Sequence, residues 1–412
     1  MTEKDYQEAL DWLFVQAPNY QIQGQKAYKP GLDNIRALCK HFGNPQEQIQ
    51  TIHIAGTNGK GSTSNMLASV LQEAGYKVGV YNSPHLVDFT ERVKVNGKKA
   101  DKVFVYDFIR KLKTLPETIR PSFFEYTTIM AFDYFFRQQV DFAIIEVGLG
   151  GRLDSTNIIL PRVSAITNVS LDHTSILGDT VEAIAREKAG IIKPGVPVVC
   201  GDQNERVKEI IKEVAQSKET KYVDASIGAP SYSSDLEGRY QINNIKVVLG
   251  LVEELKNQGV GISNQNIEEG LKNVGRNTGF IGRWYRFSED PLVICDTGHN
   301  RAGLEEVFSQ LESMDLFKHM ILGFVNDKDV GSILPLLPKN AAYYFVKPSV
   351  ERGRHPSEYE EELKKMKINY KIFEDEQSAY LYVKQIVTKK EMIFVGGSNF
   401  VVGKFLEKNL QE

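Results

Sequence analysis

The sequence predicts an α/β protein of two domains, a larger one built on a mostly parallel sheet and a smaller one that follows it. Two observations carry this prediction. Short apolar runs, which are typical of buried strands, alternate with stretches of helical apolar spacing along most of the chain. In addition, 412 residues are more than a single hydrophobic core usually serves.

In the larger domain, the predicted elements alternate in a regular order. Two amphipathic helices, at residues 4–16 and 31–41, are separated by a polar, glycine-containing loop. Turn-rich residues at 218–238 interrupt the pattern before a helix at 240–256. Strands are predicted at 51–55, 77–81, 142–148, 164–169 and 196–200, and further helices at 65–74, at 121–138 and around 186–188.

The smaller domain is predicted to begin after a change in composition at residues 286–291, which we interpret as a linker. The predicted domains are therefore residues 1–287 and 288–412. About five strands are expected in the second one, at 292–295, 320–324, 343–346, 370–373 and 392–395, with helices at 302–311, 357–366 and 377–387 between them.

Composition excludes several classes of protein. The net charge of -3 gives no electrostatic reason to expect nucleic acid or an anionic membrane as a partner. The three cysteines, Cys39, Cys200 and Cys295, form no CxxC pair and fit buried thiols in a reducing compartment. The N-terminus lacks the pattern of a signal peptide, and no apolar run reaches membrane-spanning length. We therefore expect a cytoplasmic protein.

The chain is organised around a glycine-rich turn at residues 56–62, which joins a predicted strand to a predicted helix. Three glycines surround Lys60, so backbone N–H groups and one positive charge converge on a single point. The turn departs from the standard phosphate loop, because Ile54 replaces its first glycine and Gly61 follows the lysine. A tight turn with a solvated lysine is the alternative, but we interpret the turn as a site for a nucleoside triphosphate.

Four polar residues, Lys60, Ser83, Glu146 and His173, fall at or just after the ends of predicted strands. Because ligands of open α/β sheets bind beyond the carboxyl ends of the strands, these residues are expected at one edge of one sheet. Each one alone has a structural explanation, as a turn hydroxyl, an ion-pair partner or a loop histidine. Glu146 ends a buried strand, so its carboxylate is expected to have a partner or a metal ion.

Several motifs stand out along the chain, namely Gly56-Thr57-Asn58-Gly59-Lys60-Gly61-Ser62, Ser83-Pro84-His85-Leu86, Glu91-Arg92, Glu146-Val147-Gly148-Leu149-Gly150-Gly151-Arg152-Leu153-Asp154, Leu171-Asp172-His173 and Glu187-Lys188-Ala189-Gly190. Together they resemble the Mur-type amide ligases, and most closely the branch of folylpolyglutamate synthase, which is often bifunctional with dihydrofolate synthase. The resemblance covers residues 28–300 and extends more loosely to the C-terminus.

The resemblance implies a fold, namely a Mur-ligase-like P-loop ATPase domain and a smaller Rossmann-like C-terminal glutamate ligase domain. It also implies the roles of the site residues, with Lys60, His173 and Lys188 as catalytic residues. Lys188 matches a lysine that the family carbamylates. The implied ATP contacts are Thr57, Asn58, Gly59, Lys60, Gly61, Ser62, Asn244, Arg283 and Asp296, and the implied metal ligands are Ser83, Glu146, His173 and Lys188.

The implied reaction joins L-glutamate to a reduced folate, and also to dihydropteroate, through an acyl phosphate made with ATP. Mg²⁺ is the implied metal, and the protein is expected to act as a monomer. The resemblance leaves open which of the two pterin substrates is preferred. The implied pterin-binding residues are Lys29, Pro30, Gly31, Ser122, Phe123, Phe124, Glu125, Leu153, Asp154 and Ser155.

Two alternatives differ from this interpretation. A Mur-type ligase of cell-wall synthesis would need a further N-terminal domain, and only about fifty residues precede the phosphate loop. A nucleotide-driven switch without ligase chemistry would leave Glu146, His173 and Lys188 unexplained. Release of ADP that depends on both glutamate and a pterin acid distinguishes the ligase from the switch.

Overall fold

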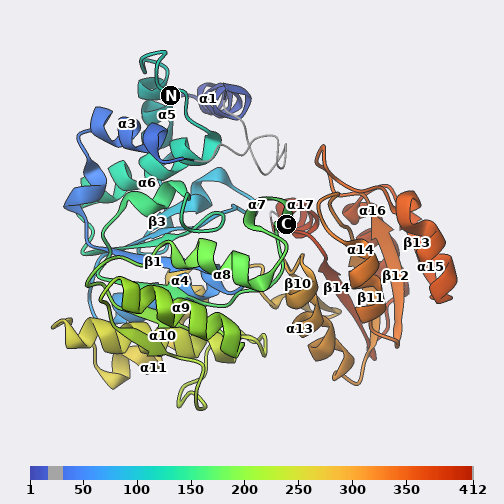
Figure 1. Cartoon of the computed structure of the whole chain (residues 1–412). Helices are drawn as coiled ribbons and strands as arrows, with labels where there is room; N and C mark the ends of the chain where they lie inside the picture. Colours follow the sequence, from blue (N-terminus) through green and yellow to red (C-terminus); the bar gives the residue numbers. More distant parts are fainter. Residues whose placement is uncertain (17–30, 411–412) are drawn as a thin grey trace. The chain divides into compact units, whose positions relative to one another are not determined.

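The structure is a computed structural model in which residues 1–16 and 31–410 are described (Figure 1). The chain forms two compact units, the first from Met1–Asp235 with Gln241–Phe280, and the second from Leu236–Tyr240 with Ile281–Glu412. The predicted loop at residues 17–30 lies outside the described residues. Among the helices that the structure describes, none is both long and apolar enough to cross a membrane.

The first unit contains an eight-stranded sheet in the order β4-β3-β2-β5-β1-β6-β7-β8. Six of these strands run parallel, namely β2, β5, β1, β6, β7 and β8, and β3 and β4 add an antiparallel hairpin at one edge. The strands are β1 (Thr51–Ala55), β2 (Val78–Tyr81), β3 (Val93–Val95), β4 (Lys98–Lys99), β5 (Phe142–Glu146), β6 (Val163–Ile166), β7 (Val198–Cys200) and β8 (Tyr222–Asp224). Because β1 and β5 are central and entirely buried, their carboxyl ends lie in the middle of the sheet edge.

Helices cover both faces of this sheet, as the parallel strands require. The core around α1, α3, α5 and α6 is rich in aromatic residues, and a separate core joins α8 and α9 to β6 and β7. The helices are α1 (Glu3–Gln16), α3 (Asp33–His41), α4 (Lys60–Glu73), α5 (Lys102–Leu112), α6 (Phe123–Gln138), α7 (Thr174–Leu177), α8 (Val181–Ala189), α9 (Glu205–Ser217), α10 (Gln241–Asn257), α11 (Asn264–Lys272) and α12 (Val274–Thr278). In Figure 1, α6 and α4 lie on opposite sides of β1.

The second unit contains a six-stranded sheet in the order β13-β12-β11-β14-β10-β9, in which only β9 is antiparallel. Its core is formed by the inner faces of β10, β11, β12 and β14 with α13. The strands are β9 (Tyr285–Glu289), β10 (Leu292–Asp296), β11 (Phe317–Leu322), β12 (Ala341–Val346), β13 (Tyr370–Phe373) and β14 (Glu391–Gly396). The helices are α13 (Arg301–Glu312), α14 (Val330–Ile333), α15 (Glu360–Met366), α16 (Glu376–Ile386) and α17 (Asn399–Asn409).

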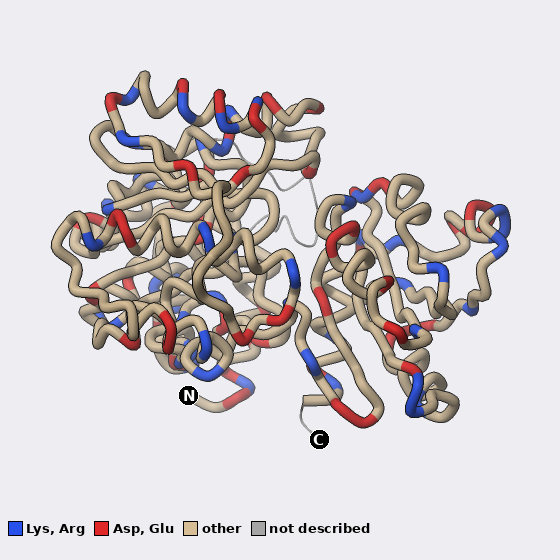
Figure 2. The backbone as a smooth tube through the Cα atoms, turned by 90° about the horizontal axis from the view of Figure 1, so that it is seen from below, with Lys and Arg blue, Asp and Glu red and all other residues tan. Residues whose placement is uncertain are grey.

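The predicted fold class is confirmed, and two details of the prediction are wrong. Residues 286–291, predicted as a linker, form most of β9 and its turn into β10, so the predicted boundary after residue 287 falls inside the second unit. The turn-rich stretch 218–238 contains β8. Both β8 and β9 lie at sheet edges, and neither contains a fully buried residue, so no apolar run marks them. The short hairpin strands β3 and β4 are also absent from the prediction. Figure 2 shows Lys and Arg interspersed with Asp and Glu along both units, in keeping with the small net charge.

Candidate nucleotide and metal site

The predicted strand-to-helix turn through glycines is present, and its backbone conformation requires two of them. Gly59 lies in the left-handed region with φ of 86° and begins α4 without a side-chain cap. Gly56 has φ of 151°, and a Cβ atom there would lie 1.9 Å from Thr167 Oγ1. A helix N-terminus reached in this way presents N–H groups that have no acceptor within the helix, together with the positive end of the helix dipole. The turn therefore has the properties of a phosphate-binding loop.

The segment after β6 holds this loop in place. Thr57 N donates to Asn168 O at 2.9 Å, and Asn58 N donates to Asn168 Oδ1 at 2.9 Å. The hydroxyl of Thr57 exchanges hydrogen bonds with the backbone of Ser170, at 3.1 and 3.2 Å. The loop is thus attached to the neighbouring strand end before any ligand binds.

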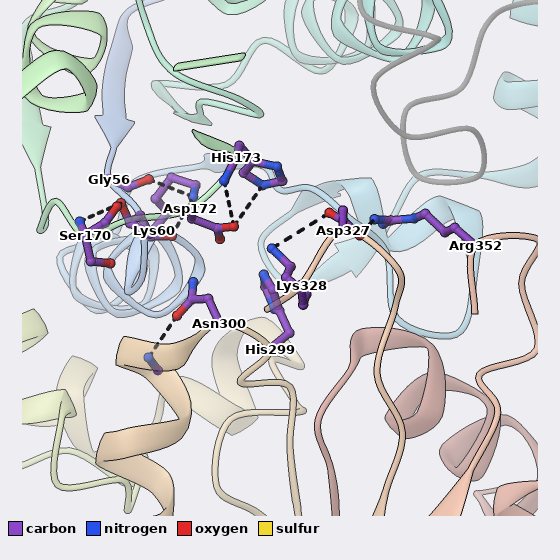
Figure 3. A network of polar contacts seen from close by, with 12 residues as sticks. Gly56, Lys60, Ser170, Asp172, His173, His299, Asn300, Asp327, Lys328 and Arg352 are labelled. Atoms are coloured by element: carbon purple, nitrogen blue, oxygen red, sulfur yellow. Dashed lines mark hydrogen bonds and ion pairs between the residues drawn. The ribbon is translucent and has the colours of Figure 1, made fainter. Parts of the chain in front are cut away.

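Two lysines meet at the carbonyl oxygen of Gly56 (Figure 3 includes the Lys60 contact). Lys60 Nζ donates to Gly56 O at 2.9 Å and to Thr57 O at 3.1 Å. Lys188 Nζ, from α8, donates to the same Gly56 O at 2.9 Å, and its side chain is buried. Burial, and secondly the charge of Lys60, lower the pKa of Lys188 to about 7, while Asp172 and Asp154 oppose this shift.

Glu146 lies at the carboxyl end of β5 and is 5% exposed. Its Oε2 accepts hydrogen bonds from Asn82 Nδ2 at 2.7 Å and from Ser83 N at 3.4 Å, so the expected partner exists and Ser83 is adjacent. A Cβ atom at Gly61 would lie 3.8 Å from the same oxygen, which places the carboxylate beside the first turn of α4. A carboxylate and a neighbouring hydroxyl beside a phosphate loop are a donor set that suits a hard divalent cation on a triphosphate.

His173 comes from a different loop. It has φ of 50°, is the N-cap residue of α7, and its backbone N–H donates to Asp172 Oδ1 at 2.9 Å. Its ring Nε2 lies 3.9 Å from the same carboxylate oxygen (Figure 3). Within the described part of the chain, no three His, Cys, Asp or Glu side chains converge as metal ligands. The structure therefore brings Ser83 to Glu146, and Lys188 to Lys60, and places His173 beside Asp172.

α10 reaches the phosphate loop from another part of the sequence. The Asn244 Oδ1 atom lies 2.2 Å from the position that a Cβ at Gly59 would take, so this amide abuts the loop. Asn244 Nδ2 donates to Gln241 Oε1 at 2.7 Å, and Gln241 Nε2 donates to Ser62 Oγ at 3.2 Å. Ser62 is buried, and its hydroxyl is thus oriented by α10.

The second unit contains the other two predicted ATP contacts, Arg283 and Asp296. Asp296 ends β10 and is buried. Its Oδ2 accepts from Tyr240 OH at 2.6 Å and Trp284 N at 2.8 Å, and its Oδ1 accepts from Gly298 N at 2.7 Å. The carboxylate therefore ties residue 240 and residues 283–284 to the end of a strand, which is a structural role within this unit. Burial and the Asp296 charge hold the pKa of Tyr240 well above its usual value.

Four predicted pterin-binding residues surround the start of α6. Ser122 Oγ accepts from Glu125 N, and Glu125 Oε2 accepts from Ser122 N at 2.6 Å, so the pair forms a capping box. Phe123 is a core residue, buried and stacked on Phe14 at 5.1 Å between ring centroids. Phe124 is partly buried, and its ring lies 5.9 Å from that of Tyr81.

The remaining predicted pterin residues lie in two loops. Asp154 is buried and accepts from Gly148 N at 3.0 Å and Leu149 N at 2.9 Å, so its carboxylate organises the loop that follows β5. Burial raises the pKa of Asp154. Leu153 and Ser155 flank it in the chain and are partly buried. Gly31 is described, with φ of 128°, whereas Lys29 and Pro30 lie outside the described residues.

Sequence reasoning missed the residues that hold the predicted ones. Asn82 donates to Glu146, Asn168 accepts from the backbone N–H of Asn58, and Gln241 donates to Ser62. Asp172 lies beside the ring of His173. In the second unit, Arg352 donates to Asp327 Oδ1 at 2.5 Å (Figure 3). Asn82 and Asp172 directly adjoin predicted site residues, and this adjacency was the available signal.

The comparisons with known proteins agree with this geometry. Residues 54–252 match the Mur ligase middle domain, and residues 282–399 match the Mur ligase glutamate ligase domain. The dihydrofolate synthase/folylpolyglutamate synthase of Buchnera aphidicola subsp. Schizaphis graminum is 30% identical over 404 residues, which cover 92% of this chain and 93% of the relative. A probable bifunctional folylpolyglutamate synthase/dihydropteroate synthase of Haloferax volcanii is 33% identical over 85% of this chain, which spans only 44% of that relative.

Solved structures are similar over nearly the whole chain. E. coli FolC in complex with DHPP and ADP has a TM-score of 0.85 at 29% identity, and the match covers 98% of this chain and 97% of that one. A bifunctional folylpolyglutamate synthase/dihydrofolate synthase from Yersinia pestis, complexed with AMPPNP and Mn ion, has a TM-score of 0.84 at 26% identity and covers 99% and 98%. The chain belongs to the dihydrofolate synthase/folylpolyglutamate synthase family of Mur-type ligases, which are ATP-dependent enzymes that add glutamate to folates.

Proposed function

We propose that this chain joins L-glutamate to a reduced folate, and also to dihydropteroate, through an acyl phosphate formed with ATP. The observation that carries the proposal is the loop at Gly56–Gly59, with Lys60 on its carbonyls and the buried Glu146 carboxylate beside its helix. A cell-wall Mur ligase is disfavoured by relatives that are named as folate enzymes along most of the chain.

The chemistry needs an activated carboxyl group, because a carboxylate is a poor electrophile. A carboxylate oxygen of the pterin acid attacks the γ-phosphorus of ATP, the bond to the β,γ-bridging oxygen breaks, and ADP leaves. The amine of glutamate then attacks the acyl carbon, the C–O bond to phosphate breaks, and the amine loses a proton as the amide forms. Lys60 and the N–H groups of the loop stabilise negative charge on the transferring phosphoryl group.

We propose Mg²⁺ as the divalent ion, since its preference for oxygen suits Ser83 and Glu146. Bound there with ATP, it would neutralise charge on the phosphates. His173 would contribute a further ligand, directly or through water. In a solved relative of this family, Mn is bound together with AMPPNP and L-glutamate, which supports a divalent ion in the family's site.

The proposed role of Lys188 is to become a carbamate. Its buried side chain and a pKa of about 7 make the neutral amine accessible near neutral pH. The ammonium group first loses one proton, and the neutral amine then adds to carbon dioxide, forming an N–C bond and releasing a second proton, so a cation becomes an anion. As an ammonium group, Lys188 does not fit a metal site, whereas its carbamate does.

The other assignments remain parts of the proposal. ATP would be bound by Thr57–Ser62, Asn244, Arg283 and Asp296. The pterin-binding region would consist of Lys29, Pro30, Gly31, Ser122, Phe123, Phe124, Glu125 and Leu153–Ser155. Phe123, Ser122 and Glu125 are engaged in packing and capping, so we expect them to shape the site and not to contact the pterin. We also propose a cytoplasmic monomer with an N-terminal ATP-binding domain and a C-terminal domain for glutamate.

The test is release of ADP in the presence of ATP, Mg²⁺ and glutamate, with dihydropteroate or tetrahydrofolate added in turn. We expect release only when glutamate and a pterin acid are both present, with a product one glutamate longer by mass. ADP release that ignores glutamate would contradict the ligase and favour a nucleotide switch. Activity with only one pterin acid would restrict the proposal to a single function.

A further inference from the structure

The carboxylate of Glu146 is held by a side-chain amide that no family motif quoted above includes. Asn82 directly follows β2, and the register of β2 on β5, with Tyr81 opposite Ile145, brings Asn82 beside Glu146. Asn82 Nδ2 donates to Glu146 Oε2 at 2.7 Å, compared with 3.4 Å for the donation from Ser83 N. Asn82 therefore makes the shorter and stronger of these two contacts.

A second buried amide fixes the orientation of Asn82. Asn65, on α4, is fully buried, and its Nδ2 donates to Asn82 Oδ1 at 3.0 Å and to Gly61 O at 2.8 Å. Both of these atoms are acceptors, so the NH₂ group of Asn65 must face them. The oxygen of Asn82 is then turned toward Asn65, and its NH₂ group is directed to Glu146. The two amides thus connect the first turn of α4 to the carboxylate.

Packing does not explain why an amide stands at position 65. Asn65 Oδ1 is buried and has no hydrogen-bond partner among the residues that the structure describes. Leaving a buried acceptor unpaired costs stability, and an apolar side chain at this position would avoid that cost. The two hydrogen bonds that Asn65 donates, to Gly61 and to Asn82, are what the residue provides in return.

We propose that Asn82 and Asn65 are positioning residues that orient Glu146 toward the divalent metal ion of the nucleotide, an inference that rests on the proposed function. A hydrogen bond to one carboxylate oxygen fixes the rotation of the group, and so the direction of the lone pairs it offers to a metal. Partners of this kind change metal affinity by about 10- to 100-fold. Because Asn65 also holds Gly61, the carboxylate and the phosphate loop are oriented together.

The experiment measures Mn²⁺ binding to the full chain in the presence of ADP, from the electron paramagnetic resonance signal of free Mn²⁺. We compare the wild type with Asn82→Ala, Asn65→Ala and the double variant. Asn82→Ala should weaken Mn²⁺ binding by about 10-fold or more, and Asn65→Ala by less. The double variant should bind as Asn82→Ala does, because Asn65 acts through Asn82.

The control is Asn96→Gly, which removes the hydrogen bond from Val78 N to Asn96 Oδ1 at the other end of β2 and leaves Mn²⁺ binding unchanged. In turnover assays, the Mg²⁺ concentration for half-maximal rate should rise in Asn82→Ala, and kcat should recover at saturating Mg²⁺. A role in folding alone would lower the melting temperature without this shift. If Asn82→Ala does not fold, Asn82→Leu, of similar shape, replaces it.

Two results overturn the inference while leaving the proposed function intact. One is wild-type Mn²⁺ affinity in the folded Asn82→Ala variant, and the other is full additivity of the two single variants, which would mean that Asn65 does not act through Asn82. A wild-type chain that binds neither Mn²⁺ nor ADP would instead contradict the proposed function. The wild-type measurement alone therefore separates the two failures.

Discussion

Lys60 and Lys188 donate to the same acceptor, the carbonyl oxygen of Gly56, each at 2.9 Å. Two positive charges that share one oxygen repel each other, and burial adds to the cost of charging the second. The pKa of Lys188 is lowered to about 7. Lys188 is therefore an amine that is readily neutral, beside the lysine of the phosphate loop.

Replacing Lys60 with alanine should abolish most turnover while the protein stays folded. The Lys60 side chain acts on phosphate charge, and it donates hydrogen bonds to the carbonyls of Gly56 and Thr57. Loss of such a charge from phosphoryl transfer lowers kcat/KM by roughly 10³-fold. ADP release and circular dichroism measure the two effects, and Lys212→Ala, on the exposed face of α9, is the control. Near wild-type ligation by Lys60→Ala would refute the phosphate-loop assignment.

Lys188 should carry carbon dioxide when bicarbonate is supplied. The neutral amine reacts, so the extent of carbamylation should rise as the pH is raised through about 7. Carbon-13 NMR of protein in labelled bicarbonate should show a carbamate signal that Lys188→Ala lacks. That variant should be nearly inactive and be partly rescued by acetate. An unmodified ammonium group in a crystal grown with bicarbonate, Mg²⁺ and nucleotide would count against the proposal.

The sequence was sufficient for the α/β class and for the main strands, because buried parallel strands leave continuous apolar runs such as 142–146. It was insufficient for β8 and β9, which lie at sheet edges and have no fully buried residue in their burial patterns. The edge of a sheet is defined by strand order, which depends on contacts between distant segments. Periodicity along one segment does not contain that information.

The same limit applies to the site. Glu146 and Lys188 could be selected because a carboxylate at a strand end and a lysine in a quoted motif each carry a local signal. In the structure Lys188 is buried, and its Nζ shares the carbonyl oxygen of Gly56 with Lys60. Asn82 adjoins Ser83 in the sequence, but its contact with Glu146 depends on the register of β2 against β5, and Asn65 carries no local signal at all.

Asp296→Asn should weaken ATP binding and also destabilise the second unit. The carboxylate accepts from Tyr240 OH, Trp284 N and Gly298 N, and an amide offers one acceptor oxygen where these donors need two. Leaving a buried donor unpaired costs about 1–3 kcal/mol. Urea denaturation gives the change in free energy of unfolding, and exposed Asp315→Asn is the control. Unchanged stability with weakened ATP binding would show that Asp296 serves the nucleotide alone.

Acid should destabilise the first unit through His53. This histidine is buried on β1 with its Nε2 2.8 Å from Thr156 Oγ1. The Thr156 hydroxyl donates to Asp154, so it accepts the hydrogen bond from the N–H group at His53 Nε2. Burial, and secondly the charge of Lys193, lower the pKa of His53 to about 3. In the unfolded chain the histidine has its usual pKa of about 6.5. Below that pH the unfolded chain therefore binds a proton that the folded chain does not bind.

Stability should accordingly fall as the pH drops from about 6.5 toward 3, by up to about 1.4 kcal/mol per pH unit for this one group. His85, with a pKa also lowered to about 3, adds a second contribution of the same sign. In His53→Gln, the slope of the free energy of unfolding against pH should be smaller by the amount that corresponds to about one proton. This difference in slope is expected whether or not the variant is as stable as the wild type at pH 7. His41→Gln, at an exposed position of α3, controls for the loss of a histidine. If urea denaturation between pH 4 and 7 gives the same slope for His53→Gln and the wild type, His53 is not the neutral buried group described here.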